Sequence, residues 1–210
     1  MKVSRLAPLL VCLPLLLAAC GEDEPKQQQA TPSPAPAPQT ASTDSVAEGV
    51  KQAALADIVE AAQAKLAEVN PEDTEVVKAE VEALLVERRK AQCGLFEGTS
   101  LQVAGWEVKV QGVHKLQELL TLQVTFANDA YLMTSFGSGL DKQLGITTAF
   151  AEGAPLYDTV AALKPGDQLV VSGTFIESDV GCIFQVDSAR PADWINFPTF
   201  LFQFSTVEKK

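Results

Sequence analysis

Few residues of this chain belong to the types that carry out covalent chemistry. It has one histidine, His114, and four cysteines, at positions 12, 20, 93 and 182. A histidine-based triad and a Cys/His zinc site both need partners that this set does not supply, so His114 is expected simply to end a strand. Scattered acidic residues could include a catalytic carboxylate pair, but their spacing matches no glycosidase or calcium-loop signature (Asp141, Asp158, Asp167, Asp179). The sequence therefore predicts no enzyme activity, no cofactor and no metal site.

The N-terminus has the parts of a secretory signal. Lys2 and Arg5 precede an apolar stretch over residues 6–17, and Leu17-Ala18-Ala19-Cys20 closes it. This ending resembles the lipobox of bacterial lipoproteins. The resemblance implies that residues 1–19 are removed, that Cys20 receives a diacylglyceryl thioether and usually a further acyl chain, and that these lipids anchor the protein to a membrane. Gly21 follows the cysteine where Asp would favour the inner membrane, so in a Gram-negative host the resemblance implies the outer membrane, facing the periplasm. An ordinary secretory signal cleaved nearby is the alternative.

Two thiols remain in the mature chain, Cys93 and Cys182. An even pair in an oxidising compartment indicates a disulfide. Closing so long a loop would stabilise the fold by about 4 to 5 kcal/mol in the chain-entropy model, which is an upper value. Two separate buried thiols are the alternative.

The charge of the chain limits the partners that it attracts. The formal net charge is −11, and removal of the signal takes away two of the 16 basic residues, Lys2 and Arg5. No part of the mature chain is basic, so a phosphate-rich partner is repelled on average. We therefore expect no nucleic acid partner, and contact with the membrane through the lipid alone.

Residues 20–44 and 45–92 differ sharply in composition. After Cys20 the chain is rich in Pro, Ala and Gln without large apolar residues, which predicts a disordered tether. Apolar residues then recur three or four apart on both sides of Asn70-Pro71, which predicts a helical hairpin over 45–92. The basic run Arg88-Arg89-Lys90 is expected to complement the C-terminal end of the second helix. The alanines of the hairpin could pack on the hairpin itself, on the following domain or on another copy, and the oligomeric state stays open.

Residues 93–210 alternate with a period of two. The pattern predicts strands at 102–113, 119–127, 131–135, 168–175, 182–188 and 199–207, with a helix at 155–163. Three strands, a helix and two strands is the order of the OB fold, a small Greek-key barrel. Leu163 to Gly173, with the turn Lys164-Pro165-Gly166-Asp167, resembles the fourth strand of bacterial OB-fold domains, and Trp106 to Gly112 resembles their first strand. The expected fold is α+β: an N-terminal helical hairpin followed by an OB-like β-barrel with one helix between strands 3 and 4. The strand at 199–207 has no assigned place and is expected to extend the sheet.

Aromatic residues crowd one stretch near the C-terminus: Trp194, Phe197, Phe200, Phe202 and Phe204. The last three fall on one side of an extended strand. Two interpretations follow, of which the first carries more weight: this face covers the barrel, or it is an exposed apolar surface that binds a protein or an apolar ligand.

These features together predict a lipid-anchored lipoprotein of the cell envelope that binds another envelope component. The first hypothesis is a protein-binding adaptor or inhibitor. The second is a sensor that binds a small molecule or glycan on the barrel face. A third, weaker hypothesis is hydrolysis by paired acidic residues.

Overall fold

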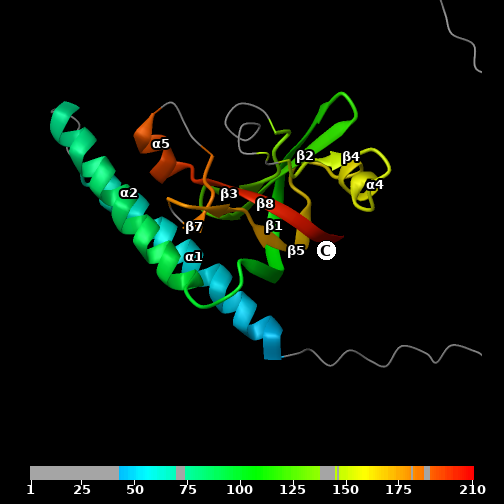
Figure 1. The fold of residues 1–210 in the computed structure, drawn as a ribbon, viewed down its shortest axis with the longest axis horizontal. Coiled ribbons are helices and arrows are strands. Elements are labelled where there is room, and N and C mark those ends of the chain that lie inside the picture. Colours follow the sequence, from blue (N-terminus) through cyan, green and yellow to red (C-terminus); the bar gives the residue numbers. More distant parts are fainter. Residues whose placement is uncertain (1–42, 70–73, 138–144, 146, 181, 187–189) are drawn as a thin grey trace, which may run out of the picture. The chain divides into compact units, whose positions relative to one another are not determined.

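The computed structural model describes residues 43–69, 74–137, 145, 147–180, 182–186 and 190–210. The lipobox with Cys20, the tether up to residue 42, and the predicted break at Asn70-Pro71 lie outside these residues. Two long helices come first, α1 (Thr43–Ala67) and α2 (Thr74–Phe96), which lie side by side as a hairpin (Figure 1). Because α2 continues to Phe96, Arg88-Arg89-Lys90 lies within the helix, and the predicted position of this basic run at the helix end is wrong.

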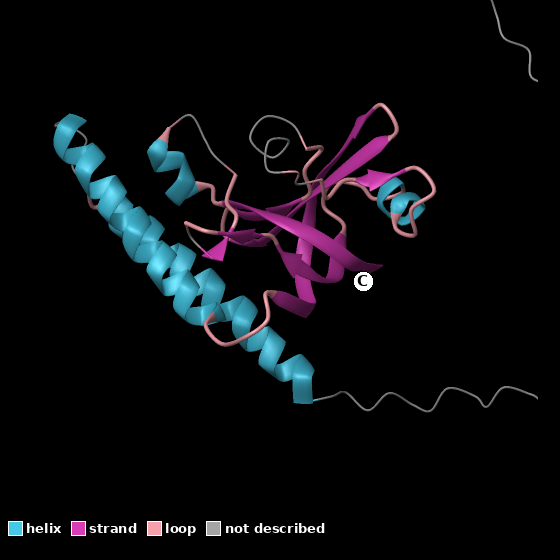
Figure 2. Ribbon diagram, in the orientation of Figure 1, coloured by secondary structure: helices cyan, strands magenta, loops and turns pink. Residues whose placement is uncertain are grey.

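The chain then enters a β domain that also carries short helices (Figure 2). The element order through this domain is β1 (Gln102–Leu116), β2 (Leu119–Ala127), β3 (Ala130–Met133), β4 (Phe150–Ala151), α4 (Tyr157–Ala161), β5 (Gln168–Phe175), β6 (Glu177–Ser178), β7 (Cys182–Ile183), α5 (Pro191–Asn196) and β8 (Thr199–Lys209).

Strand pairing closes a barrel. β1 pairs antiparallel with both β2 and β5, β5 pairs antiparallel with β8, β8 pairs parallel with β3, and β3 returns antiparallel to β2. This circuit is the connectivity of an OB-fold barrel. It is not a plain barrel, because β4 adds a sixth strand beside β2, and β6 and β7 form a separate small sheet. The predicted α+β class with N-terminal helices is confirmed. The helix predicted between the third and fourth barrel strands is α4, which lies between β3 and β5 in the chain.

The strand that completes the barrel differs from the predicted one. Residues 182–188 were expected to be the fifth barrel strand, but only Cys182–Ile183 forms a strand, and it pairs with β6. The barrel is completed by β8, which was expected only to extend the sheet. β8 runs for 11 residues and buries Phe200, Phe202 and Phe204, whereas Cys182 has a left-handed backbone (φ 62°) that interrupts an extended run. The longer alternating segment therefore takes the barrel position.

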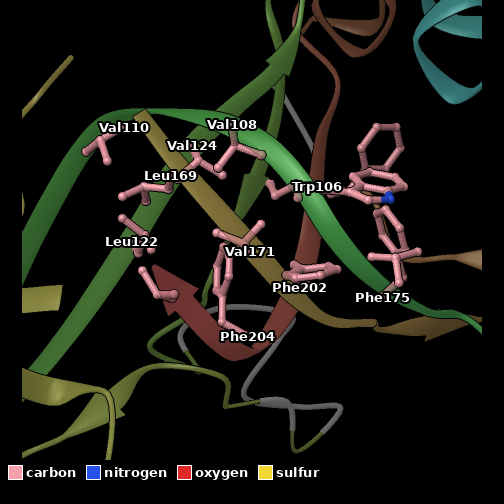
Figure 3. Packing of buried hydrophobic residues seen from close by; sticks show 14 of the residues in the cluster. Trp106, Val108, Val110, Leu122, Val124, Leu169, Val171, Phe175, Phe202 and Phe204 are labelled. Atoms are coloured by element: carbon pink, nitrogen blue, oxygen red, sulfur yellow. The ribbon is translucent and has the colours of Figure 1, made fainter. Parts of the chain in front are cut away.

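The barrel interior is filled by side chains from alternate positions of its strands. Figure 3 shows this packing, in which valines and leucines occupy one part and aromatic rings the other. Trp106 and Phe175 lie at the aromatic part with ring centroids 5.5 Å apart, and Phe175 packs edge-on to Phe202 at 5.1 Å. The side chains of Trp106 and Phe175 are both fully buried. The core therefore leaves the barrel no open lumen among the residues described.

Helices add to this core from two directions. Tyr157 and Val160 come from α4, while Leu55 and Val59 come from α1, and all four belong to the cluster that fills the barrel. Figure 1 shows α4 and the hairpin on opposite sides of the strands. Gln52 adds polar contacts between α1 and the barrel: its side-chain amide donates to the carbonyl of Glu107 (2.7 Å) and accepts from the Glu107 N–H (3.1 Å). The hairpin is thus part of the barrel's packing.

Candidate binding surfaces

The aromatic residues singled out in the sequence do not form one surface. Phe200 and Phe202 are fully buried and Phe204 nearly so, with the Phe202 and Phe204 rings 4.8 Å apart inside the barrel. The expectation that these three could line an exposed binding face is corrected: they are core, because the strand that carries them closes the barrel. Trp194 and Phe197 lie elsewhere, on α5 and just after it.

Trp194 and Phe197 differ in their surroundings. Trp194 packs beside a second, smaller core made by Ala62, Val81, Leu85 and Ile195, and the Arg89 guanidinium lies 5.7 Å from its ring centre. Phe197 is 49% exposed. Among the five candidates, Phe197 is the one that presents a large exposed ring, which is too little apolar area to define a binding face alone.

The predicted disulfide is confirmed. Cys93 and Cys182 are bonded, with their Cα atoms 5.4 Å apart and a sequence separation of 89. Because Cys93 lies in the last turns of α2 and Cys182 begins β7, the bond ties the helical hairpin to the segment that connects β5 with β8.

A buried polar layer forms a second tie, which the sequence interpretation missed. Arg88 on α2 is 2% exposed. Its guanidinium donates to the Trp194 carbonyl and to the Gln185 side-chain oxygen, while the Gln185 amide donates to the same carbonyl (2.8 Å). The missed signal is periodic: Val81, Leu85, Arg88 and Gln92 are spaced four, three and four apart, so Arg88 belongs to the buried stripe of α2.

The charge of Arg88 is held without an ion pair among the residues that the structure describes. Burial, and secondarily the neighbouring Arg89, lowers the pKa of Arg88 to about 10, so it stays charged at neutral pH. Its Nε atom and the Nε2 atom of Gln92 are buried without hydrogen-bond partners. The barrel core and the small core around Ile195 are two distinct clusters of buried apolar residues.

A groove runs between the two long helices. Its volume is about 250 Å³, and every lining residue comes from α1 or α2, none from the barrel. The least exposed residues of its lining are Ile58, Ala62, Leu84 and Arg88. Beside them, the small side chains of Ala61 and Ala91 are exposed. The lining is almost entirely apolar. A second hollow of about 350 Å³ continues it toward the hairpin turn, sharing Lys65, Leu84 and Glu87.

The rim of this groove is charged. Lys65 on α1 and Glu87 on α2 form an ion pair at 2.5 Å. Further acidic residues line the two hollows: Asp57 on α1 lines the first, and Glu68 just after α1 and Glu80 on α2 line the second. The apolar floor is therefore bordered by more acidic than basic exposed side chains.

A larger cleft of about 720 Å³ lies beside the disulfide. It is formed by the end of α2, the loop that follows and the β6–β7 hairpin, and it includes both cysteines. Its polar residues are Lys90, Glu97, Thr99, Glu177, Ser178 and Asp179. This mixed lining contrasts with the apolar groove of the hairpin.

The residues first considered for chemistry are spread over the fold. His114 is exposed near the end of β1, as expected. Asp158 lies on α4, Asp179 follows β6, and Asp141 is outside the described residues. Asp167 accepts from the Lys164 N–H (2.9 Å) and pairs with Lys209 (2.8 Å), and these two contacts lower its pKa. Over the described ranges, no three His, Cys, Asp or Glu residues gather where they could hold a metal ion.

Comparison with known proteins finds no matching family, no matching curated protein and no matching solved structure. Among the helices in the described ranges, none combines the length and the apolar character needed to cross a bilayer.

Proposed function

We propose that this protein is a lipid-anchored lipoprotein of the cell envelope that binds another envelope protein through the groove between α1 and α2. The observation that carries the proposal is this apolar groove, about 250 Å³ in volume and lined by the two helices alone. The Leu17-Ala18-Ala19-Cys20 sequence supports the anchor, and the Cys93–Cys182 disulfide fits an oxidising compartment. In a Gram-negative host the proposed location is the outer membrane, facing the periplasm.

The shape of the groove favours a protein partner over a small molecule. An open trough between two helices offers a continuous apolar strip, and helical segments of partner proteins commonly lie in such grooves. Alanines at its edges, Ala61 and Ala91, let a partner backbone approach closely. A small molecule would leave much of its surface in water, because small-molecule pockets generally enclose their ligands.

The barrel acts as the support in this proposal. Its interior is packed with side chains and receives residues from α4 and α1, so recognition is assigned to the outer surface. The disulfide, the Arg88 layer and the small core around Ile195 hold α2 in place. A groove held by three attachments loses little conformational freedom when a partner binds.

In-cell photo-crosslinking tests the function. Benzoylphenylalanine replaces Ala91 in the groove, and the matched control replaces Lys164, which is exposed at the turn before β5. We expect one discrete protein adduct from position 91, absent from position 164, and lost when Ala61→Trp fills the groove. Ala64→Trp, on an exposed position of α1 outside the groove lining, should retain the adduct. Equal adducts from both positions, or none from either, would contradict the proposal.

Anchoring is tested separately. Cys20→Ala should move the protein from the membrane fraction to the soluble fraction and abolish incorporation of a labelled fatty acid. Retention in the membrane fraction together with unchanged labelling would exclude Cys20 as the lipid site.

The cleft beside the disulfide supports a second candidate, a sensor for a polar small molecule or glycan. It is the larger space, about 720 Å³, and its lining offers donors and acceptors from Thr99, Glu177 and Ser178. A thermal shift on adding envelope glycan fragments, abolished by Ser178→Trp, would favour this candidate. The groove adduct described above would favour the adaptor.

A further inference from the structure

We infer that the occupant of the hairpin groove is a basic amphipathic helix of the partner, about three turns long. This inference rests on the proposed function, because it names the chemistry of the partner at the same site. Three properties of the molecule support it: the charges at the groove edge, the span over which they occur, and the composition of the rest of this chain.

The exposed charge along the groove is acidic. Glu87 is paired with Lys65, and the buried guanidinium of Arg88 is directed to the Trp194 carbonyl and Gln185. Asp57, Glu68 and Glu80 take part in no salt bridge among the residues described. Lysines or arginines flanking the apolar face of a partner would therefore meet complementary charge from Asp57 at the groove and from Glu68 and Glu80 at the adjoining hollow.

The span of the acidic residues sets the length of the partner. Asp57 lies on α1 and Glu68 lies one residue beyond its end, so at 1.5 Å per residue this acidic edge spans about 15 Å of helix. A helix of about 11 residues covers this distance. Its apolar residues would recur three and four apart to follow the floor formed by Ile58, Ala62 and Leu84.

Two other occupants fit less well. Residues 21–42 of this chain have no large apolar side chain and cannot supply an apolar face to the groove. A second copy of the chain would bring its own net charge of −11 and the same acidic edge against this one, which is repulsive. Charge complementarity thus selects a different protein with a basic helix.

Peptide binding to the full-length protein in detergent tests the inference. The probes are two labelled three-turn helical peptides with the same leucine face, one flanked by lysines and the other by glutamates, measured by fluorescence anisotropy. We expect the lysine peptide to bind at least about tenfold more tightly at low salt, with the difference shrinking as salt rises. The triple variant Asp57→Lys, Glu68→Lys, Glu80→Lys should reverse the preference. Ala91→Trp should weaken binding of the lysine peptide, and Ala64→Trp should not.

Equal affinity of the two peptides, or a preference that the triple variant leaves unchanged, would overturn the inference. So would a groove adduct in cells that proves to be a second copy of this chain, or a partner segment with no basic helix. A different protein bound through a segment with no basic helix would leave the proposed function standing while the inference falls, whereas a second copy of this chain would overturn both. Loss of any groove adduct removes the proposed function, whatever the peptides do.

Discussion

Gly173 offers the sharpest test of how this barrel is closed. It lies on β5, where it pairs with Val103 of β1 on one side and Phe204 of β8 on the other. The register of β5 with β8 shifts between Ser172 and Gly173. A Cβ atom added here would overlap the carbonyl oxygen of Gln203 and the ring of Phe202, whose Cζ atom would be only 2.8 Å away. The residue is a glycine because β8 passes directly over it.

The magnitude follows from which atoms would have to move. Overfilling a packed core generally costs 1 to 3 kcal/mol, when flexible side chains absorb the change. In this case one obstacle is the backbone of β8, which is paired with β3 and β5, and the other is the fully buried ring of Phe202. We therefore expect Gly173→Ala to lower the free energy of unfolding by about 3 kcal/mol or more.

The assay is urea denaturation at neutral pH with the disulfide intact, followed by tryptophan fluorescence and far-UV circular dichroism. The matched control is Gly94→Ala in α2, where an added Cβ meets nothing within 4 Å; this variant should gain about 0.5 to 1 kcal/mol. If Gly173→Ala stays within about 0.5 kcal/mol of the parent, the packing of β8 against β5 described above is incorrect.

Three further outcomes are expected in the same denaturation assay. Asp167→Asn should have a lower free energy of unfolding than the parent at pH 7. This difference should close as pH falls below the ordinary carboxyl pKa of 3.8, because a lowered pKa adds stability only where the carboxylate is ionised. A difference that persists at pH 2 would contradict this. Arg88→Met should change the free energy of unfolding by no more than about 1 kcal/mol, since it removes the buried charge itself. Gln185→Leu should cost about 2 to 3 kcal/mol, because it leaves that charge without one of its acceptors. The reverse order of the two effects would refute the account of the polar layer. The double variant Cys93→Ser, Cys182→Ser should lose about 2 to 4 kcal/mol and become insensitive to reducing agent, and a variant as stable as the oxidised parent would refute it.

Local periodicity was sufficient to find most strands but not their partners. The alternation over 102–113, 119–127 and 168–175 corresponds closely to β1, β2 and β5, because side chains two apart face the same core. Which strand completes the barrel is a question of non-local pairing. Chain order favoured residues 182–188, while the parallel pairing of β8 with β3 brings a later segment into that position. The alternation in β8 was visible, but nothing in it identified β3 as its neighbour.

The candidate site was less accessible from sequence because it depends on tertiary packing. A basic run such as Arg88-Arg89-Lys90 usually indicates a solvated helix face, yet Arg88 is buried while Lys90 is exposed. The difference arises because α5 and Gln185 cover one side of α2. The groove likewise exists only because α1 and α2 are adjacent, and the sequence left the packing of their alanines open. The disulfide was predictable because it needed only a count of thiols and a compartment.

The connection between β5 and β8 explains how an OB-like barrel comes to present a helical binding surface. In OB folds the loop between the fourth and fifth strands borders the ligand face. Here that connection makes two attachments to the hairpin. Its strand β7 supplies Cys182 to the disulfide with α2, and its helix α5 supplies Ile195 to the small core shared with both long helices. The hairpin thus occupies the side of the barrel that this loop would otherwise leave to a ligand, and its own contribution to the barrel core, Leu55 and Val59, fixes it there. Within the proposed function, recognition has moved from the strands to the groove between α1 and α2.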